Sequence, residues 1–192
     1  MKKALIFTYS GFQDHEVVYP YYRLLGDGFV VHVVADKKDS QGRFYGIFGL
    51  NMPCDILWSD FTNTVNIEDY DFLVIPGGVK SLEKLRQNHE ALAFIESWNA
   101  QGKLIASTCH GAQMLISAKI IKKRKITGYY SIKDDIINAG AIYTNEPFVI
   151  DKNIITSPHY DYMGEWMEQA IKLYTKLNGK SRKRNSNETV GV

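Results

Sequence analysis

Short, almost purely apolar runs that end in polar or glycine-rich loops constrain the fold of this chain most strongly. The run Phe72-Leu73-Val74-Ile75 contains no polar position, so a strand formed by it must be covered on both faces. Runs of the same kind and of strand length occur at residues 4–8, 30–35, 104–107 and 154–156. Strands buried on both faces are typical of parallel sheets with helices on either side, so the pattern predicts an α/β fold.

Segments with helical periodicity separate several of these runs. They lie at residues 15–26, 82–101, 111–118, 132–139 and 163–178, and the second should break near Asn88. Gly102, Gly140 and Gly179 stand just past three of these segments, where glycine often ends a helix. Residues 43–56 predict a short hairpin. We therefore expect one domain over residues 1–179, built as a three-layer α/β/α sandwich around a mostly parallel sheet.

The last residues differ in composition from the rest of the chain. Residues 180–192 have almost no apolar side chains and include the basic cluster Lys180-Ser181-Arg182-Lys183-Arg184. Such a segment has little surface to bury, so we expect a disordered basic tail, with a localisation signal as the alternative.

Composition and charge narrow the classes of partner and compartment. The chain has 192 residues, 45% of them apolar, which is enough for a single core. Its net charge of +2 is spread along the sequence, which argues against nucleic acid as the main partner. Two cysteines, no export-signal pattern after Met1 and no long apolar span together predict a soluble cytoplasmic protein without disulfides and without membrane contact.

The sequence Ser107-Thr108-Cys109-His110-Gly111 directly follows an apolar run and predicts a sharp turn between a strand and a helix. Small residues two positions before and after Cys109 let the strand and the helix approach closely, as at the nucleophile elbow of hydrolases. Backbone N–H groups at the start of the following helix would favour the thiolate form of Cys109. The alternative is a buried core cysteine, but the flanking residues are small and polar rather than branched and apolar.

Other loops should meet Cys109, because ligands of an open parallel sheet bind at the carboxyl ends of its strands. The runs at residues 4–8, 72–75 and 154–156 lead into loops at residues 10–16, 76–78 and 157–161. Gly77 and Gly78 would allow backbone N–H groups to face a ligand and, with the His110 amide, to form an oxyanion hole. A glycine pair after a strand is also a common turn.

Four motifs together give the chain a resemblance to a known family. They are Gly11-Phe12-Gln13-Asp14-His15-Glu16 with Tyr19-Pro20, Asp71-Phe72-Leu73-Val74-Ile75-Pro76-Gly77-Gly78, Ser107-Thr108-Cys109-His110-Gly111-Ala112-Gln113, and Ile132-Lys133-Asp134-Asp135 with Asn138-Ala139-Gly140. From Met1 to about Asn178 the chain resembles the ThiJ/PfpI superfamily, whose fold is that of class I glutamine amidotransferases, and is most similar to its PfpI branch of intracellular-protease-like proteins. The resemblance implies a flavodoxin-like sheet. It implies no metal and no organic cofactor.

The same resemblance implies roles for individual residues. Cys109 would be the nucleophile, and Glu16 would lie against its sulfur and share a proton with it. His110 would be the base, oriented by a glutamate of another subunit that corresponds here to Glu83, so the site would be complete only in a homodimer or larger homo-oligomer. Tyr129 would line the pocket. On position alone, Glu16 would be an ordinary acid in the first turn of a helix, and the alternatives are a packed interface residue for His110 and a surface aromatic for Tyr129.

The chain departs from the PfpI pattern at two places. Gln13 stands where many relatives have an acid, and Ser157-Pro158-His159-Tyr160-Asp161 stands where the branch usually has an arginine, a proline and an aspartate. In the related class I glutamine amidotransferases a His-x-Glu after the last strand completes a Cys-His-Glu triad. His159, oriented by Asp161, is therefore an alternative base for Cys109.

These residues lead to the expectation of a cysteine-dependent hydrolase or lyase. It would act on small reactive carbonyl compounds or their adducts, in the manner of a glyoxalase or deglycase, as part of a stress response. Its mouth would be lined by aromatic residues that include Phe12, Tyr129 and Tyr160. One alternative is a PfpI-like intracellular cysteine peptidase or amidase with a peptide substrate. Another is a non-enzymatic redox sensor or chaperone in which Cys109 is oxidised.

Overall fold

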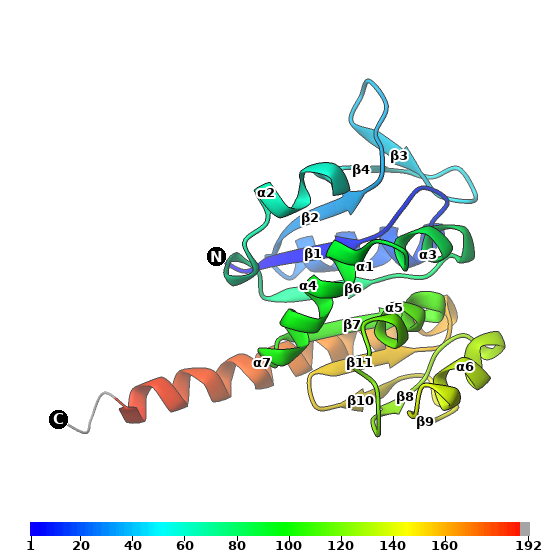
Figure 1. Ribbon diagram of the computed structural model, residues 1–192. Helices are drawn as coiled ribbons and strands as arrows, with labels where there is room; N and C mark the ends of the chain where they lie inside the picture. The colour runs from blue at the N-terminus through cyan, green and yellow to red at the C-terminus, as the bar shows by residue number, and fades with distance from the viewer. Residues whose placement is uncertain (189–192) are drawn as a thin grey trace.

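The structure is a computed structural model that describes the backbone of residues 1–188 and the side chains of residues 1–179. Its centre is a seven-stranded sheet with the order β10-β11-β7-β6-β1-β2-β5 (Figure 1). The strands of this sheet are β1 (Lys3–Phe7), β2 (Val30–Ala35), β5 (Ile56–Leu57), β6 (Phe72–Ile75), β7 (Leu104–Thr108), β10 (Val149–Asp151) and β11 (Ile154–Ser157). Six of them run parallel, and β10 at one edge is antiparallel to β11.

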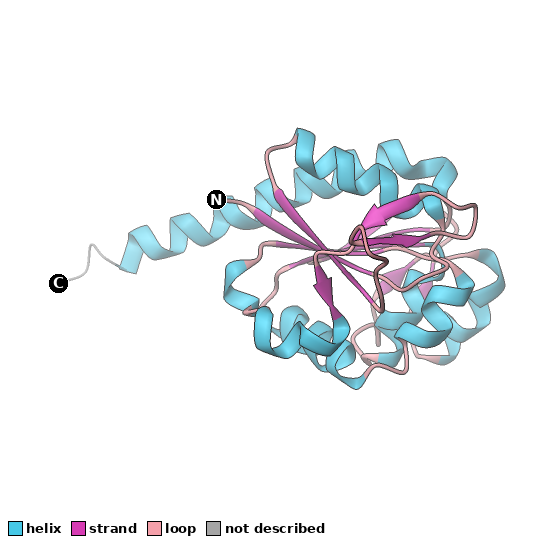
Figure 2. Ribbon diagram, turned by 90° about the horizontal axis from the view of Figure 1, so that it is seen from above, coloured by secondary structure: helices cyan, strands magenta, loops and turns pink. Residues whose placement is uncertain are grey.

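Helices cover both faces of the sheet. They are α1 (Asp14–Gly26), α2 (Phe61–Thr64), α3 (Val79–Leu85), α4 (His89–Ala100), α5 (Ala112–Ser117), α6 (Lys133–Asn138) and α7 (Met163–Glu188). Seen from above, the sheet lies between two layers of helices (Figure 2). The predicted three-layer α/β/α sandwich is therefore confirmed. In the described part of the chain, no helix combines the length and the apolar character needed to cross a bilayer.

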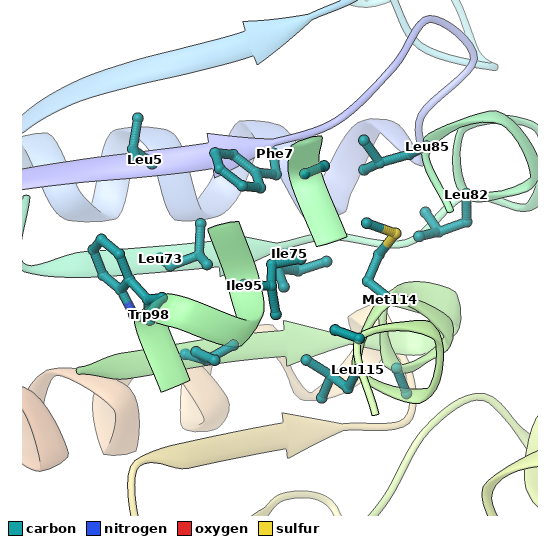
Figure 3. Close-up of a cluster of buried hydrophobic side chains, with 14 of the residues drawn as sticks. Leu5, Phe7, Leu73, Ile75, Leu82, Leu85, Ile95, Trp98, Met114 and Leu115 are labelled. Atoms are coloured by element: carbon teal, nitrogen blue, oxygen red, sulfur yellow. The ribbon is translucent and has the colours of Figure 1, made fainter. Parts of the chain in front are cut away.

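The alternation of side chains along the strands builds one core on each face. On β1, Leu5 and Phe7 join a fully buried cluster under α3, α4 and α5, which Figure 3 shows in detail. Their neighbours Ala4 and Ile6 point to the opposite face and pack under α1 and α7. Burial on both faces is the reason that these strands are apolar at every position.

The strand order identifies the place where a ligand would bind. Taken in chain order, β1, β2, β6, β7 and β11 lie side by side as 2-1-3-4-5, which is the order of flavodoxin-like folds. The order reverses at β1, which pairs with both β2 and β6. Ligands of such folds bind outside the carboxyl ends of the strands near this reversal. The loops that follow β1, β6 and β7 therefore define the candidate site.

The C-terminal helix is longer than the sequence predicts. We expected a helix over residues 163–178 and a disordered tail after residue 179, but α7 continues through Glu188 and projects beyond the sheet (Figure 1). Extending an existing helix needs no new nucleation, and lysine and arginine are good helix formers, so the composition of this segment is compatible with a helical backbone. The remainder of the predicted tail, residues 189–192, lies outside the described residues.

Two shorter elements agree with the expectation, and others were not predicted. The helical segment at residues 82–101 breaks at Asn88 as expected, and Asn88 caps the second helix by accepting a 3.1 Å hydrogen bond from the Ala91 N–H. The predicted hairpin is formed by β3 (Arg43–Tyr45) and β4 (Asn51–Pro53). The edge strands β5 and β10 and a separate pair, β8 (Lys125–Ile126) with β9 (Ile142–Tyr143), were not predicted. Each has only two or three residues, which is too short for a periodic pattern.

Candidate active site

Cys109 occupies a strained turn between β7 and α5. It begins a single 3-10 turn, Cys109–Gly111, and has a backbone φ of +55°. Side chains with a Cβ atom rarely adopt this conformation, which in folded proteins is concentrated at functional sites. A Cβ atom at Gly111 would collide with the Ile75 carbonyl oxygen and lie 2.7 Å from Ser107 Oγ. The close approach of strand and helix that the small residues predict is therefore present.

Glu16 lies against this turn, in the first turn of α1, and is fully buried. The Gly77 N–H donates a 2.6 Å hydrogen bond to its Oε2 atom. Burial raises the pKa of the Glu16 carboxyl to about 7, although the hydrogen bonds from Gly77 and Cys109 act in the opposite direction. Near neutral pH the site therefore contains both protonated and ionised Glu16.

The electrostatics of Cys109 differ from the expectation of a stabilised thiolate. The side chain is only 6% exposed, and burial is the largest cause of a raised thiol pKa. The charge of an ionised Glu16 raises this pKa further, whereas the N–H groups of His110 and Gly78 lower it. The expected low pKa is therefore wrong for the form with ionised Glu16. In the form with protonated Glu16 the repulsion between the two groups is absent.

Gly77 and Gly78 bring the loop after β6 into contact with both groups. A Cβ atom at Gly77 would lie 2.5 Å from Glu16 Oε2 and 2.8 Å from Cys109 Cβ, so only glycine fits there. Gly78 has a φ of +104° and packs directly on the backbone of Phe12. The Gly77 N–H, which was predicted to hold an oxyanion, is directed at Glu16 instead. This leaves Gly78 and His110 as the backbone donors at the sulfur.

His110 contacts the sulfur from the other side. Its Nδ1 atom lies 3.3 Å from Cys109 Sγ, and its Nε2 atom lies 3.4 Å from Ser131 Oγ. One neutral tautomer satisfies both contacts, with Nδ1 accepting from the thiol and Nε2–H donating to Ser131. Burial lowers the pKa of His110, which favours this neutral form. The imidazole is thus in position to accept the Cys109 proton.

Aromatic rings continue outward from His110 in a row that we call the aromatic row. Tyr129 stacks on His110 with a centroid separation of 4.6 Å, and its backbone N–H donates to the Cys109 carbonyl oxygen. It also stacks at 6.1 Å on His159, which contacts Tyr160 at 3.8 Å. Tyr160 in turn stacks on His15 at 4.9 Å. Tyr129 and Tyr160 therefore lie in one row with His110 and His159, and their role in lining a substrate mouth stays a prediction.

His15 was missed as a site residue, although it stands next to Glu16 in the sequence. Successive helical residues point in different directions, so Glu16 turns into the core while His15 is exposed and faces Tyr160. The signal available in the sequence was the position of His15 within the motif that contains Glu16.

The structure gives His159 one of the two contacts that a triad requires, the contact with Asp161. Its Nδ1 atom lies 3.1 Å from Asp161 Oδ2 and 3.3 Å from the Asp161 backbone nitrogen. Among the described contacts, His159 reaches the His110 ring through Tyr129 rather than meeting Cys109 directly. A triad of Cys109, His159 and Asp161 therefore stays a prediction.

Two predicted site residues lie elsewhere. Phe12 was expected in the mouth but is fully buried, packed at 4.9 Å against Phe44 of the hairpin. The expectation was wrong because the hairpin folds over this side chain and places it in the core. Glu83 is exposed on α3, where its carbonyl oxygen accepts a hydrogen bond from Gln87. Its predicted contact with His110 of another subunit stays a prediction.

Among the described residues, histidine, cysteine and carboxylate side chains form no group of three that could hold a metal ion.

Comparison with known proteins agrees with this geometry. A profile of the DJ-1/PfpI family matches residues 2–173. The protein named Deglycase PfpI from Pyrococcus furiosus is 36% identical over 171 residues, which cover 89% of this chain and 98% of that protein. General stress protein 18 from Bacillus subtilis is 30% identical over 176 residues, which cover 91% of this chain and 98% of that protein.

A solved structure supports the same assignment. A two-domain protein from Anabaena variabilis contains a DJ-1/ThiJ/PfpI-like domain and a ferritin-like domain, and it matches this chain with a TM-score of 0.81 and 30% identity. The match covers 93% of this chain and 48% of that protein, so the chain spans about half of its length. With a family match over residues 2–173 and relatives aligned over nearly their full length, the chain belongs to the DJ-1/PfpI family.

Proposed function

We propose that this protein is a cysteine-dependent hydrolase or lyase that acts on small reactive carbonyl compounds or their adducts. The observation that carries the proposal is the 3.3 Å contact between Cys109 Sγ and His110 Nδ1. A thiol beside a neutral imidazole can transfer its proton as it attacks an electrophilic carbon. The names of two relatives, a deglycase and a general stress protein, support the substrate class and a role in stress.

The first step joins Cys109 to the carbonyl carbon of the substrate. The sulfur forms a bond to carbon, the π electrons of the C=O bond move to oxygen, and the thiol proton passes to His110 Nδ1. The N–H groups of Gly78 and His110, which point at the sulfur, would donate to the developing negative charge on the oxygen. Return of the proton to the oxygen gives a neutral hemithioacetal.

Glu16 is suited to the later proton transfers. With a pKa of about 7 it exchanges a proton near neutral pH, which is the condition for an efficient general acid or base. For a 2-oxoaldehyde, the proton on the carbon attached to sulfur would move to the neighbouring carbon, converting the hemithioacetal into a 2-hydroxy thioester. Water then breaks the thioester and releases a 2-hydroxy acid and the free thiol. The overall change consumes one water and needs no external oxidant or reductant.

The test is turnover of methylglyoxal and of a methylglyoxal-treated amino acid, followed by release of lactate. We expect wild-type protein and Cys54→Ala to be active and Cys109→Ala to be inactive. Cys54 is the matched control because it is the second cysteine, is also buried, and donates its hydrogen bond to the Ile56 carbonyl oxygen far from His110. Turnover that survives Cys109→Ala would overturn the proposal.

Amide hydrolysis is the second candidate, because a cysteine paired with a histidine also supports acyl transfer. It would require His110, or His159 in its place, to protonate the leaving amine. Cleavage of a peptide library that is lost with His110→Ala, without lactate release, would favour this candidate. Peroxide-dependent oxidation of Cys109 with neither activity would favour a redox sensor.

A further inference from the structure

A concave surface lies at the end of the sheet opposite to Cys109. It has a volume of about 740 Å³ and is formed by the end of α4, the segment between α5 and β8, the β10–β11 turn and α7. Gly102 lines it just before β7 begins, whereas Cys109 follows the end of that strand. Seven residues of extended chain span roughly 20 Å, so the two sites share no groups. We call this surface the basic cavity.

Charge in the basic cavity is of one sign. Its lining includes the cationic side chains of Lys122, Arg124, Lys152 and Lys176 and contains no carboxylate. None of the three lysines has an ion-pair partner within 4 Å among the described side chains. Lysines gathered in a concave surface concentrate positive potential and attract anions.

Arg124 differs from the lysines because its guanidinium is already satisfied. It is 8% exposed and forms an ion pair with Asp151 at 3.0 Å. It also donates to the carbonyl oxygen of Asp151 and to the side-chain oxygens of Asn99 and Asn153. Asp151 uses its other carboxylate oxygen to accept from the Lys125 N–H. The Asp151 carboxylate is therefore occupied by Arg124 and by the Lys125 N–H, and it forms no ion pair with any of the three lysines.

The walls between these charges are apolar. They are formed by Ile120, Ile150, Leu173 and Leu177. Ile150 is 41% exposed, so part of this apolar surface faces solvent. An inorganic anion would leave that surface wet, whereas an organic anion with an apolar group would cover it.

We propose that the basic cavity binds a small organic phosphate, with the phosphate held by Lys122, Lys152 and Lys176 and the organic group packed on the apolar wall. Three ammonium groups suit a phosphate dianion better than a single carboxylate, because each lysine adds a favourable charge interaction. Lys152 also stands at a turn position with a φ of +53°, where glycine or asparagine would be less strained. This binding site is separate from the reaction proposed for Cys109.

Titration calorimetry with phenyl phosphate and with inorganic phosphate, at one fixed salt concentration, tests the proposal. We expect phenyl phosphate to bind more tightly, and Lys122→Gln, Lys152→Gln and Lys176→Gln each to weaken both ligands by roughly two- to tenfold. Ile150→Ser should weaken phenyl phosphate and leave inorganic phosphate unchanged. Thermal unfolding of each variant shows whether the fold is retained.

The control for charge is Lys172→Gln, because Lys172 lies one turn before Lys176 on α7 and pairs with Glu168 at 2.6 Å. It should bind phenyl phosphate as wild type does, and so should Cys109→Ala, which separates this site from the reactive cysteine. Phenyl phosphate binding that is unaffected by the three lysine variants would overturn the proposal. Binding of a long polyanion such as heparin without any binding of phenyl phosphate would also overturn it.

Discussion

The Gly77 N–H donates a 2.6 Å hydrogen bond to Glu16 Oε2, and this bond joins the loop after β6 to the first turn of α1. Glu16 is fully buried, and its second oxygen, Oε1, has no hydrogen-bond partner among the described residues. A hydrogen bond between Glu16 and the Cys109 thiol lowers the pKa of the carboxyl, but less than burial raises it. One backbone donor does not offset the burial, and this is why the pKa of Glu16 rises to about 7.

The first prediction concerns the pH dependence of stability. Glu16 has a higher pKa in the folded protein than in the unfolded chain, so the folded protein holds the Glu16 proton more tightly. The stability that this proton contributes is fully present below about pH 4.5 and is lost as the pH rises to about 7. Over this range we expect the free energy of unfolding of wild type to fall by about 3 kcal/mol relative to Glu16→Gln. Glutamine keeps an acceptor for Gly77 and imitates the protonated carboxyl. Urea unfolding between pH 4 and pH 8 measures the difference. Glu96→Gln, an exposed acid on α4, should follow wild type at every pH.

The second prediction concerns the reactivity of Cys109. Both the charge of Glu16 and its hydrogen bond with the thiol raise the pKa of Cys109. Glu16→Gln removes the charge, so at pH 8 we expect iodoacetamide to alkylate Cys109 roughly tenfold faster than in wild type. Mass spectrometry in a Cys54→Ala background follows the single remaining thiol. Slower alkylation of the glutamine variant would mean that ionised Glu16 promotes the thiolate instead of opposing it.

The third prediction tests the fit of the glycine loop. Gly77→Ala places a methyl group 2.5 Å from Glu16 Oε2 and 2.8 Å from Cys109 Cβ, so the three elements must separate. We expect turnover to fall at least a hundredfold and stability to fall by about 1–3 kcal/mol. Gly26→Ala is the matched control, because nothing lies within 4 Å of its added Cβ atom and alanine favours the helix. Wild-type turnover by Gly77→Ala would show that the loop is loosely packed.

The fold could be predicted from the sequence because the strands of the central sheet are buried on both faces. All four residues of β6 are buried, and a strand that is covered on both faces is apolar at every position. The turn at Cys109 was also recognisable, because the packing of Gly111 on Ile75 leaves no room for a side chain. The correct predictions of the α/β fold and of the turn at Cys109 therefore depended on burial and on local steric constraints.

The errors arose where distant segments decide the outcome. Phe12 is buried only because Phe44, 32 positions later in the numbering, folds over it. The pKa of Cys109 depends on the balance between burial, Glu16 and the backbone N–H groups of His110 and Gly78, and the turn alone specifies only the His110 N–H. The stacking of His15 on Tyr160 joins opposite ends of the chain. None of these relationships has a signature within a short window of sequence.

The last prediction tests whether two subunits share one site. Glu83 is exposed on α3, so its predicted role in orienting His110 requires a second chain. We expect Cys109→Ala and Glu83→Gln each to lose turnover, and Glu96→Gln to remain active. After the two inactive variants are unfolded and refolded together, a site with Cys109 from one chain can receive Glu83 from the other. For randomly mixed dimers this restores on the order of a quarter of wild-type turnover. Full activity of Glu83→Gln alone would show that His110 is held within its own chain, and the contact of His110 Nε2 with Ser131 Oγ would then be the orienting interaction.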